Sequence, residues 1–168
     1  NYLGTPDYTH GTPARTGVLV VNLGTPDEPT TSAVRRYLAE FLWDPRVIEQ
    51  PRALWWLILH GIILRTRPAK SAHAYQKVWT PAGSPLMVES RALAEGLAAK
   101  LRGRFGDRVR VELAMTYGNP SIRSALERLR AANVQRLLVL PMYPQYSSTT
   151  TASIFERVTA ELARWRWI

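Results

Sequence analysis

The chain has 168 residues, a mass of 19.0 kDa and a formal net charge of +9 at neutral pH. Its hydrophobic share of 46% and charged share of 21% are typical of an ordinary folded domain and exclude a disordered or fibrous protein. The sequence contains no cysteine, which excludes disulfides, thiolate metal sites and iron–sulfur clusters and fits a reducing cytosol.

The positive charge leaves three classes of partner open, namely nucleic acid, an anionic membrane surface and an acidic small substrate. The arginines are spread along the chain and are not gathered in one tail. No helix-turn-helix pattern, zinc-finger spacing or aromatic RNA-binding motif accompanies them, so we expect no nucleic-acid partner.

Residues 1–16 are rich in Gly, Pro, Thr and Tyr and have no apolar period, which predicts an extended, mobile lead-in. The chain begins at Asn1 without an initiator methionine and without a secretory leader, and both ends look cut. We therefore expect one folded domain over residues 17–168.

The first folded elements are a strand and a helix. Residues 17–23 form a β-branched apolar run that predicts a strand buried on both faces, and Gly24-Thr25-Pro26 ends it. Thr30 or Thr31 is suited to cap a helix with apolar positions up to Leu42 at helical spacing, and Asp44-Pro45 stops that helix.

Three further helices are predicted in the middle of the chain. One begins at Pro51 and continues to about residue 65, and a short one follows Pro68 over residues 69–78. After a loop over residues 80–85, a long helix spans about 87–102 and ends at the glycines of residues 103–107.

The remaining elements repeat the order strand, loop, helix. We predict strands over 109–115 and 136–142 and helices over 121–131 and 150–165. This order indicates an α/β fold, with a three-layer parallel sheet, helices on both faces and right-handed crossovers.

Ligands of such sheets bind beyond the carboxyl ends of the strands. The loops there begin at Leu23, Tyr117 and Tyr143, so we expect them to converge on one rim. None carries a dinucleotide fingerprint or a phosphate loop, and Gly83-Ser84-Pro85 is not a hydrolase nucleophile motif.

The three histidines, His10, His60 and His73, do not have the spacing of a helical metal site. For His60, which lies in an apolar helix, packing is favoured over metal ligation. His73 is favoured as a structural or surface residue, with substrate contact as its alternative. We expect no metal ligands in this chain.

Residues 143–150 are unusual because a buried strand ends in two tyrosines and then in four Ser and Thr residues that lead into a helix. A helix N-terminus offers free N–H groups to an anion. The alternative is a Ser/Thr-rich cap beside packed tyrosines, and both interpretations stay open.

Residues 51–70 are apolar on all sides of the predicted helix and have basic flanks. The strongly apolar part, residues 53–64, is too short to cross a bilayer. The segment is either buried in a core or presents one face to a lipid surface or an apolar ligand, and both alternatives stay open.

Three motifs carry a family resemblance. They are residues 18–26 followed by Arg35-Arg36-Tyr37-Leu38, then Gly83-Ser84-Pro85-Leu86, and then Leu140-Pro141-Met142-Tyr143-Pro144-Gln145-Tyr146-Ser147. In this order and spacing they closely resemble bacterial-type ferrochelatases, and the resemblance extends from residue 17 to the end of the chain.

The resemblance implies a lyase of haem biosynthesis that inserts Fe²⁺ into protoporphyrin IX. Such an enzyme has two similar four-stranded α/β halves with the porphyrin in a cleft between them, and this chain resembles the first half with an apolar lip at about residues 51–70. Porphyrin and iron are its substrates, and no cofactor is expected. A cytoplasmic location is implied, with peripheral contact at the inner face of a membrane through residues 53–64.

The resemblance also assigns a porphyrin site. Its predicted members are Leu23, Arg67, Lys70, Tyr75, Ser84, Tyr143 and Tyr146. Apolar and aromatic groups suit the faces of the flat ring, and Arg67 and Lys70 suit its carboxylates.

The histidine and the glutamate thought to take the pyrrole protons and deliver iron lie in the family's second half. The resemblance therefore implies a missing C-terminal half as partner and an inactive isolated chain. Two alternatives remain, namely a chelatase for another metal or tetrapyrrole and a non-catalytic tetrapyrrole-binding half-domain.

Overall fold

A computed structural model describes residues 3–4 and 9–165. Within them the chain divides into two compact units. The sheet unit comprises the chain up to Leu23, Ser90–Thr116, and Pro120 onward, and the helical unit comprises Gly24–Glu89 together with Tyr117–Asn119.

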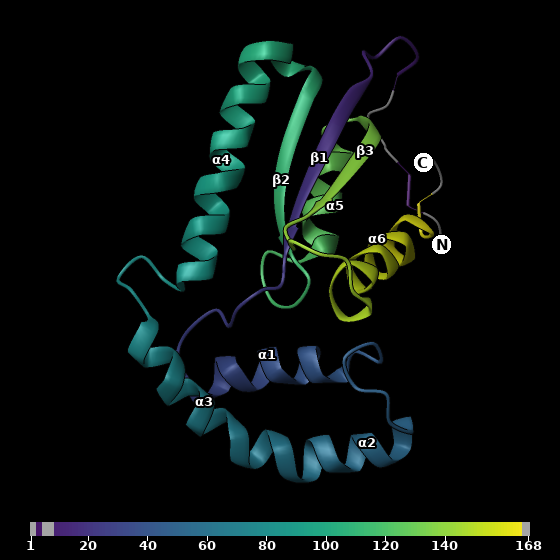
Figure 1. Ribbon diagram of the computed structural model, residues 1–168. Coiled ribbons are helices and arrows are strands. Elements are labelled where there is room, and N and C mark those ends of the chain that lie inside the picture. Colours follow the sequence, from purple (N-terminus) through teal and green to yellow (C-terminus); the bar gives the residue numbers. More distant parts are fainter. Residues whose placement is uncertain (1–2, 5–8, 166–168) are drawn as a thin grey trace. The chain divides into compact units, whose positions relative to one another are not determined.

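The sheet unit contains three parallel strands in the order β2-β1-β3 (Figure 1). They are β1 (Arg15–Asn22), β2 (Val109–Met115) and β3 (Val134–Pro141). The predicted parallel α/β sheet is confirmed. β1 lies in the centre, so its apolar run is buried on both faces.

Two helices, α5 (Ile122–Ala131) and α6 (Ser153–Leu162), pack against one face of this sheet (Figure 1). α5 begins as predicted at Ser121, whose hydroxyl accepts a hydrogen bond of 3.2 Å from the backbone N–H of Ser124. Their buried contacts with the strands are made by Leu19, Val21, Ala114, Ala125, Leu126, Leu129, Ile154 and Val158.

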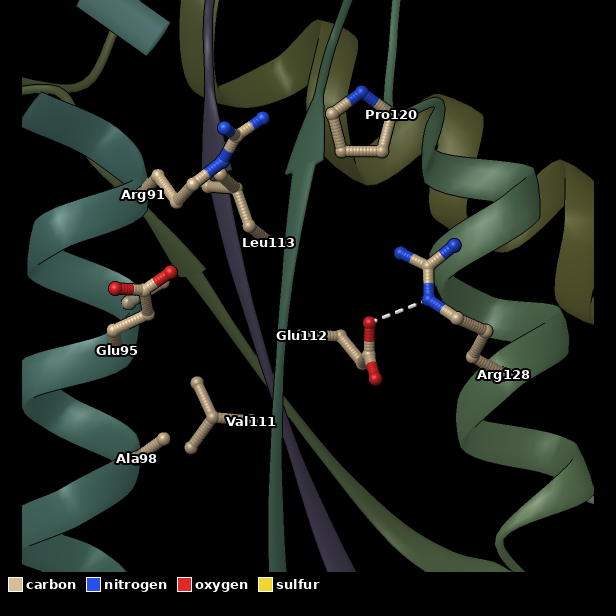
Figure 2. Close-up of a pocket in the computed structure, with 9 residues that line it drawn as sticks. Arg91, Glu95, Ala98, Val111, Glu112, Leu113, Pro120 and Arg128 are labelled. Carbon is tan, nitrogen blue, oxygen red and sulfur yellow. Dashed lines mark hydrogen bonds and ion pairs between the residues drawn. The ribbon is translucent and has the colours of Figure 1, made fainter. Parts of the chain in front are cut away.

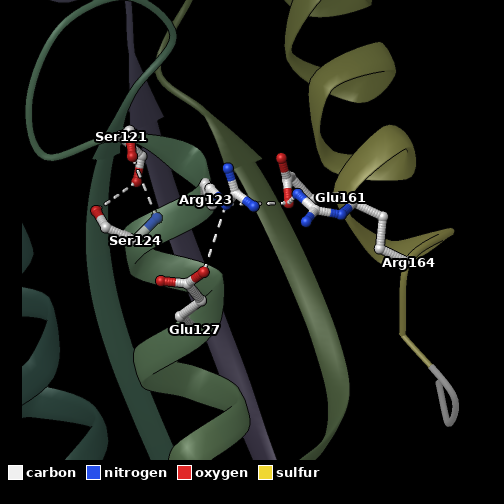
Figure 3. A network of polar contacts seen from close by, with 6 residues as sticks. All are labelled: Ser121, Arg123, Ser124, Glu127, Glu161 and Arg164. Carbon is white, nitrogen blue, oxygen red and sulfur yellow. Dashed lines mark hydrogen bonds and ion pairs between the residues drawn. The ribbon is translucent and has the colours of Figure 1, made fainter. Parts of the chain in front are cut away.

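Ion pairs join α5 and α6 at the surface (Figure 3). Arg123 Nε lies 3.4 Å from Glu127 on its own helix and 3.7 Å from Glu161 on α6, and Glu161 is also 3.3 Å from Arg164. Exposed pairs of this kind contribute little individually, so the apolar contacts beneath them hold the two helices.

α4 (Pro85–Phe105) lies on the opposite face of the sheet over its Ser90–Phe105 part. Val111 and Leu113 alternate with Ala114 along β2 and therefore face away from α5. They line a pocket of about 260 Å³ with residues of α4, and Glu112 pairs with Arg128 at 2.6 Å on its other wall (Figure 2). The predicted helices on both faces are thus confirmed.

α4 is longer than predicted at both ends. Gly103, expected to end it, lies inside the helix, and the chain leaves the helix at Gly106, which adopts a positive φ of 63°. A glycine can be tolerated inside an exposed helix, whereas the left-handed conformation at the helix end favours glycine.

In the helical unit, α1 (Thr31–Trp43) begins as predicted, because the Thr30 hydroxyl accepts a hydrogen bond from the N–H of Ala33. After the turn at Asp44, α2 (Arg52–Ile58), a π-helical turn η1 (Leu59–Ile63) and α3 (Leu64–Val78) follow without a break. The predicted interruption at Pro68 is wrong, since this proline lies buried within α3.

The physical reason is local. A proline inside a helix removes one N–H and crowds the preceding turn. A π turn, which interrupts the regular α-helical hydrogen bonds, lies directly upstream, and the Thr66 hydroxyl donates a hydrogen bond of 2.9 Å to the carbonyl of Ile62.

Three further boundaries differ from the prediction. β1 begins at Arg15, inside the expected lead-in, and β3 begins at Val134. A π turn, η3 (Ser148–Ala152), precedes α6, which ends at Leu162. Within the expected lead-in, the backbone N–H of Leu3 donates a hydrogen bond of 2.8 Å to the carbonyl of Arg164. The other lead-in residues 1–2 and 5–8 lie outside the described part of the chain.

Candidate functional site

The three strands end side by side. The Thr116 amide and hydroxyl donate to the carbonyl of Asn22 at 2.8 and 3.1 Å, and the Met142 amide donates to the carbonyl of Val21 at 2.8 Å. The side-chain amide of Asn22 donates a hydrogen bond of 3.0 Å to the hydroxyl of Ser90 on α4. The prediction that the strands end at one edge is confirmed for the sheet unit.

Leu23 follows this edge and is half-buried. Its amide donates 2.8 Å to Asn22 Oδ1, so the side chain of Asn22 fixes the first residue of the loop after β1. An apolar side chain held at the carboxyl end of a central strand is placed where open α/β sheets bind ligands.

Tyr143 and Tyr146 follow β3 but differ in environment. Tyr143 is half-buried, and its buried hydroxyl has no hydrogen-bond partner within the described residues. Burial raises the pKa of the Tyr143 phenol, and the nearby Thr116 side chain offsets part of that shift. Tyr146 is 74% exposed.

The hydroxyl residues after Tyr146 bond mainly to one another. Ser147 Oγ lies 2.7 Å from Thr150 Oγ1 and 3.2 Å from Thr149 Oγ1, and no side chain caps the π turn that follows. The interpretation of this segment as a side-chain cap is therefore wrong for the turn itself, and anion binding there stays a prediction.

In the helical unit, Arg67, Lys70 and Tyr75 all lie on α3. Arg67 and Lys70 are exposed and three residues apart, so they are neighbours on the helix surface. Tyr75 is half-buried, and burial raises the pKa of its phenol, with the Tyr37 side chain offsetting part of the shift.

Ser84 is buried at the start of α4, where its carbonyl accepts a hydrogen bond of 3.0 Å from the Val88 amide. The preceding turn is closed by two backbone hydrogen bonds between Thr80 and Gly83, of 3.0 and 2.9 Å. Gly83 adopts a φ of 115°, which favours glycine. The turn therefore fixes the backbone that leads into Ser84.

The apolar segment 51–70 has two sides. Leu42 of α1 packs with Trp55, Leu59 and Leu64 in a buried cluster. The side chains that α2 and η1 leave exposed are those of Leu54, Trp56, Leu57 and Ile62, each more than half exposed. Core burial and an exposed apolar face therefore coexist on this segment.

The described residues contain no group of three His, Asp or Glu side chains close enough to hold a metal ion. His10, His60 and His73 are exposed, and the ring of His60 lies 5.1 Å from that of Trp56. His60 thus contacts an aromatic neighbour on the apolar segment.

The sequence matches the family profile described as Ferrochelatase over residues 15–168. It is 61% identical over 165 residues to a ferrochelatase of Thioalkalivibrio sulfidiphilus (strain HL-EbGR7), covering 98% of this chain and 45% of that protein. It is 56% identical over 167 residues to a ferrochelatase of Marinobacter nauticus (strain ATCC 700491 / DSM 11845 / VT8), covering 99% and 45%. The chain belongs to the ferrochelatase family.

The chain spans about half the length of the ferrochelatases it matches and corresponds to their N-terminal half. The family resemblance of the sequence is therefore confirmed. Of the seven predicted ferrochelatase site residues, Leu23, Tyr143 and Tyr146 lie in the sheet unit, and the other four lie in the helical unit.

Sequence reasoning missed three acidic residues beside the loop that follows β2. Asp27, Glu40 and Asp44 each accept a hydrogen bond from one residue of Tyr117–Asn119. The only available signal was the i, i+4 spacing of Glu40 and Asp44, which places both carboxylates on one helix face.

Proposed function

We propose that this chain forms part of a ferrochelatase that inserts Fe²⁺ into protoporphyrin IX and that it supplies one wall of the porphyrin site. The observation that carries the proposal is the 61% identity to a ferrochelatase over nearly the whole chain. The aromatic and apolar residues at the carboxyl ends of the strands support it, since a porphyrin is a flat apolar ring.

The proposed roles follow from side-chain chemistry. Leu23, Tyr143 and Tyr146 contact the porphyrin ring, and burial raises the pKa of the Tyr143 phenol further above its ordinary value. Arg67 and Lys70 pair with the ring's carboxylates, because both are exposed and adjacent on α3. Tyr75 and Ser84 are the two remaining residues of the proposed porphyrin site.

Metal insertion replaces two pyrrole protons by one Fe²⁺ ion, so charge balances and no electron is transferred. A base must take those protons. The family resemblance assigns that role to a histidine and a glutamate of the second half, and we therefore expect this chain to be inactive without a C-terminal half.

The test is an anaerobic absorbance assay of protoporphyrin IX with ferrous iron. It is run on this chain, on the separately expressed C-terminal half of the Thioalkalivibrio sulfidiphilus relative, and on their mixture. Metalloporphyrin in the mixture alone supports the proposal. Turnover by this chain alone contradicts the assignment of the base to the other half. Porphyrin retention without turnover in an associated mixture favours a non-catalytic binding module.

Replacement of iron in the same mixture tests the alternative of a different chelatase. A chelatase for cobalt or nickel should turn over those ions with protoporphyrin faster than Fe²⁺. A sirohydrochlorin chelatase should turn over sirohydrochlorin and leave protoporphyrin unchanged. Preference for Fe²⁺ and protoporphyrin supports the ferrochelatase proposal.

Variants on α3 test the carboxylate contacts. Arg67→Ala and Lys70→Ala should each weaken protoporphyrin binding by about tenfold, because a charge-assisted hydrogen bond contributes about 1.5 kcal/mol. Lys77→Ala removes an exposed positive charge from the same helix and is the matched control. Equal losses in all three variants would show general attraction to the porphyrin charge instead of specific pairing.

We also propose that the protein works in the cytoplasm and touches the inner face of a membrane through residues 53–64. Among the described residues, no helix has the length and apolarity that a bilayer crossing requires. Trp56 and Leu57 are 51% and 60% exposed, and Arg65 follows them on the next turns, which suits an anionic lipid surface.

Flotation with phosphatidylglycerol-containing vesicles tests this contact. The Trp56→Ser/Leu57→Ser variant should lose most of its vesicle-bound fraction, whereas Leu93→Ser, an exposed leucine on α4, should not. Equal binding by both variants would contradict a specific role of residues 53–64.

A further inference from the structure

Three successive residues after β2 are each held by a different carboxylate. The Tyr117 hydroxyl donates a hydrogen bond of 2.8 Å to Asp44 Oδ2. The Gly118 amide donates one of 2.8 Å to Glu40 Oε2, and the Asn119 side chain donates one of 3.0 Å to Asp27 Oδ1. We call the three carboxylates with residues 117–119 the loop clasp.

The centre of the clasp is buried. Tyr117 is fully buried and Asp44 nearly so, and a buried hydrogen bond to a carboxylate is stronger than one between neutral groups. The Tyr117 ring also packs edge-on against Phe41, with 5.1 Å between the ring centres. Asp44 Oδ1 accepts 2.8 Å from the Arg46 amide, so the same carboxylate holds the turn after α1.

The backbone of the clasp leaves no room for a larger residue at its middle position. Gly118 has a φ of 83°, and a Cβ atom on it would lie 2.9 Å from the carbonyl oxygen of Thr25. The loop after β2 thus lies directly against the loop after β1 and against α1, all within the helical unit.

Chain connectivity makes this attachment significant. Tyr117–Asn119 belongs to the helical unit, whereas its neighbours Thr116 and Pro120 belong to the sheet unit. The side chains of the clasp thus hold the β2–α5 connection against α1 within the helical unit.

We propose that Glu40 and Asp44 are positioning residues that fix the β2–α5 loop as part of the ligand-binding rim. This inference rests on the proposed porphyrin site, because it assigns the loop at the carboxyl end of β2 to that rim. The two carboxylates act through Tyr117 and Gly118 and do not themselves touch the porphyrin.

The first readout does not involve porphyrin. In Glu40→Ala, amide hydrogen exchange at Gly118 should accelerate by about tenfold or more, because its hydrogen bond to a charged acceptor is lost. Glu40→Gln retains an amide oxygen that accepts the same bond and should restore most of the protection. Glu89→Ala, an exposed glutamate on a helix, is the matched control.

The second readout is the Kd for protoporphyrin IX, measured by fluorescence well below the unfolding temperature of every variant. Glu40→Ala and Tyr117→Phe should weaken binding by about threefold to tenfold, with Glu40→Gln and Glu89→Ala close to wild type. Tyr117→Phe keeps the ring contact with Phe41 and removes only the hydroxyl, which donates the hydrogen bond to Asp44.

The outcomes separate this inference from the proposed function. Unchanged exchange at Gly118 in Glu40→Ala overturns the clasp. Faster exchange with an unchanged Kd overturns its role at the rim while the porphyrin site stands. A wild-type chain that binds no protoporphyrin, alone or with the C-terminal half, overturns the proposed function and the rim assignment together, and the exchange data still decide whether the clasp exists.

Discussion

The indole N–H of Trp55 donates a hydrogen bond of 2.8 Å to the backbone carbonyl of Leu42. Both residues are buried, and together with Leu59 and Leu64 they form the core of the helical unit. The carbonyl belongs to the last turn of α1, where no helical N–H remains to bond it. Trp55 thus satisfies the end of one helix while its ring fills the core beneath α2.

Trp55→Phe should lower the free energy of unfolding by about 1–3 kcal/mol, because the Leu42 carbonyl loses its donor and the core loses volume. Urea unfolding monitored by circular dichroism measures the change. Trp56→Phe, one residue away and 51% exposed, should change it by less than about 0.5 kcal/mol. Equal losses would contradict the distinct roles of the two tryptophans.

Gly17→Ala should destabilise the sheet unit by about 1–3 kcal/mol. A Cβ on this buried β1 residue would lie 2.9 Å from Val134 Cγ1 and 3.1 Å from a Leu129 methyl group, so these side chains or the backbone that carries them must shift. At Gly96, on the exposed side of α4, a Cβ would have no other atom within 4 Å. Gly96→Ala should therefore raise the free energy of unfolding by about 0.5–1 kcal/mol. Thermal unfolding of both variants tests the contrast in sign.

Alkaline pH should destabilise the fold through Tyr75 and Tyr143. Burial raises the pKa of both phenols above the value of about 10 expected in the unfolded chain. The folded state therefore binds these protons more tightly, so the stability that the two phenols contribute is fully present below about pH 10 and is lost as pH rises through the folded pKa. The free energy of unfolding, measured from pH 8 to 11, checks this dependence.

Tyr143→Phe should reduce that alkaline loss of stability, because it removes one of the two groups. Tyr146→Phe is the matched control, since its side chain is 74% exposed. An unchanged pH dependence in the double variant Tyr75→Phe/Tyr143→Phe would assign the loss to other groups.

The outer face of β3 should promote self-association. Leu138 and Leu140 are 55% and 37% exposed there, whereas Leu137 and Val139 face the core, and β3 is an edge strand among the described residues. Leu138→Lys should increase the monomer fraction in size-exclusion chromatography with light scattering and leave stability nearly unchanged. Leu137→Lys should unfold the sheet unit, because it buries a charge.

The parallel sheet was predictable because its strands are written as local patterns. Residues 109–115 alternate apolar and polar side chains, and the predicted and observed bounds of β2 agree. The burial of β1 on both faces agrees with its apolar run, whereas β3, also expected to be buried, is an edge strand among the described residues and exposes Leu138 and Leu140. The N-terminus of α1 was predictable because Thr30 caps it through a bond three residues along the chain.

Contacts between distant residues decided the rest. Residues 51–70 are divided into a buried and an exposed side by packing against α1. No local pattern reports such packing.

Local sequence patterns were enough to predict the family and the order of strands and helices along the chain. The folded chain was needed to show that Glu40 and Asp44 hold the loop at residues 117–118, and that Tyr143 is half-buried whereas Tyr146 is 74% exposed. The physical reason is separation along the chain. Hydrophobic periodicity and caps act over a few residues, whereas a hydrogen bond such as that of Tyr117 to Asp44 joins residues 73 positions apart.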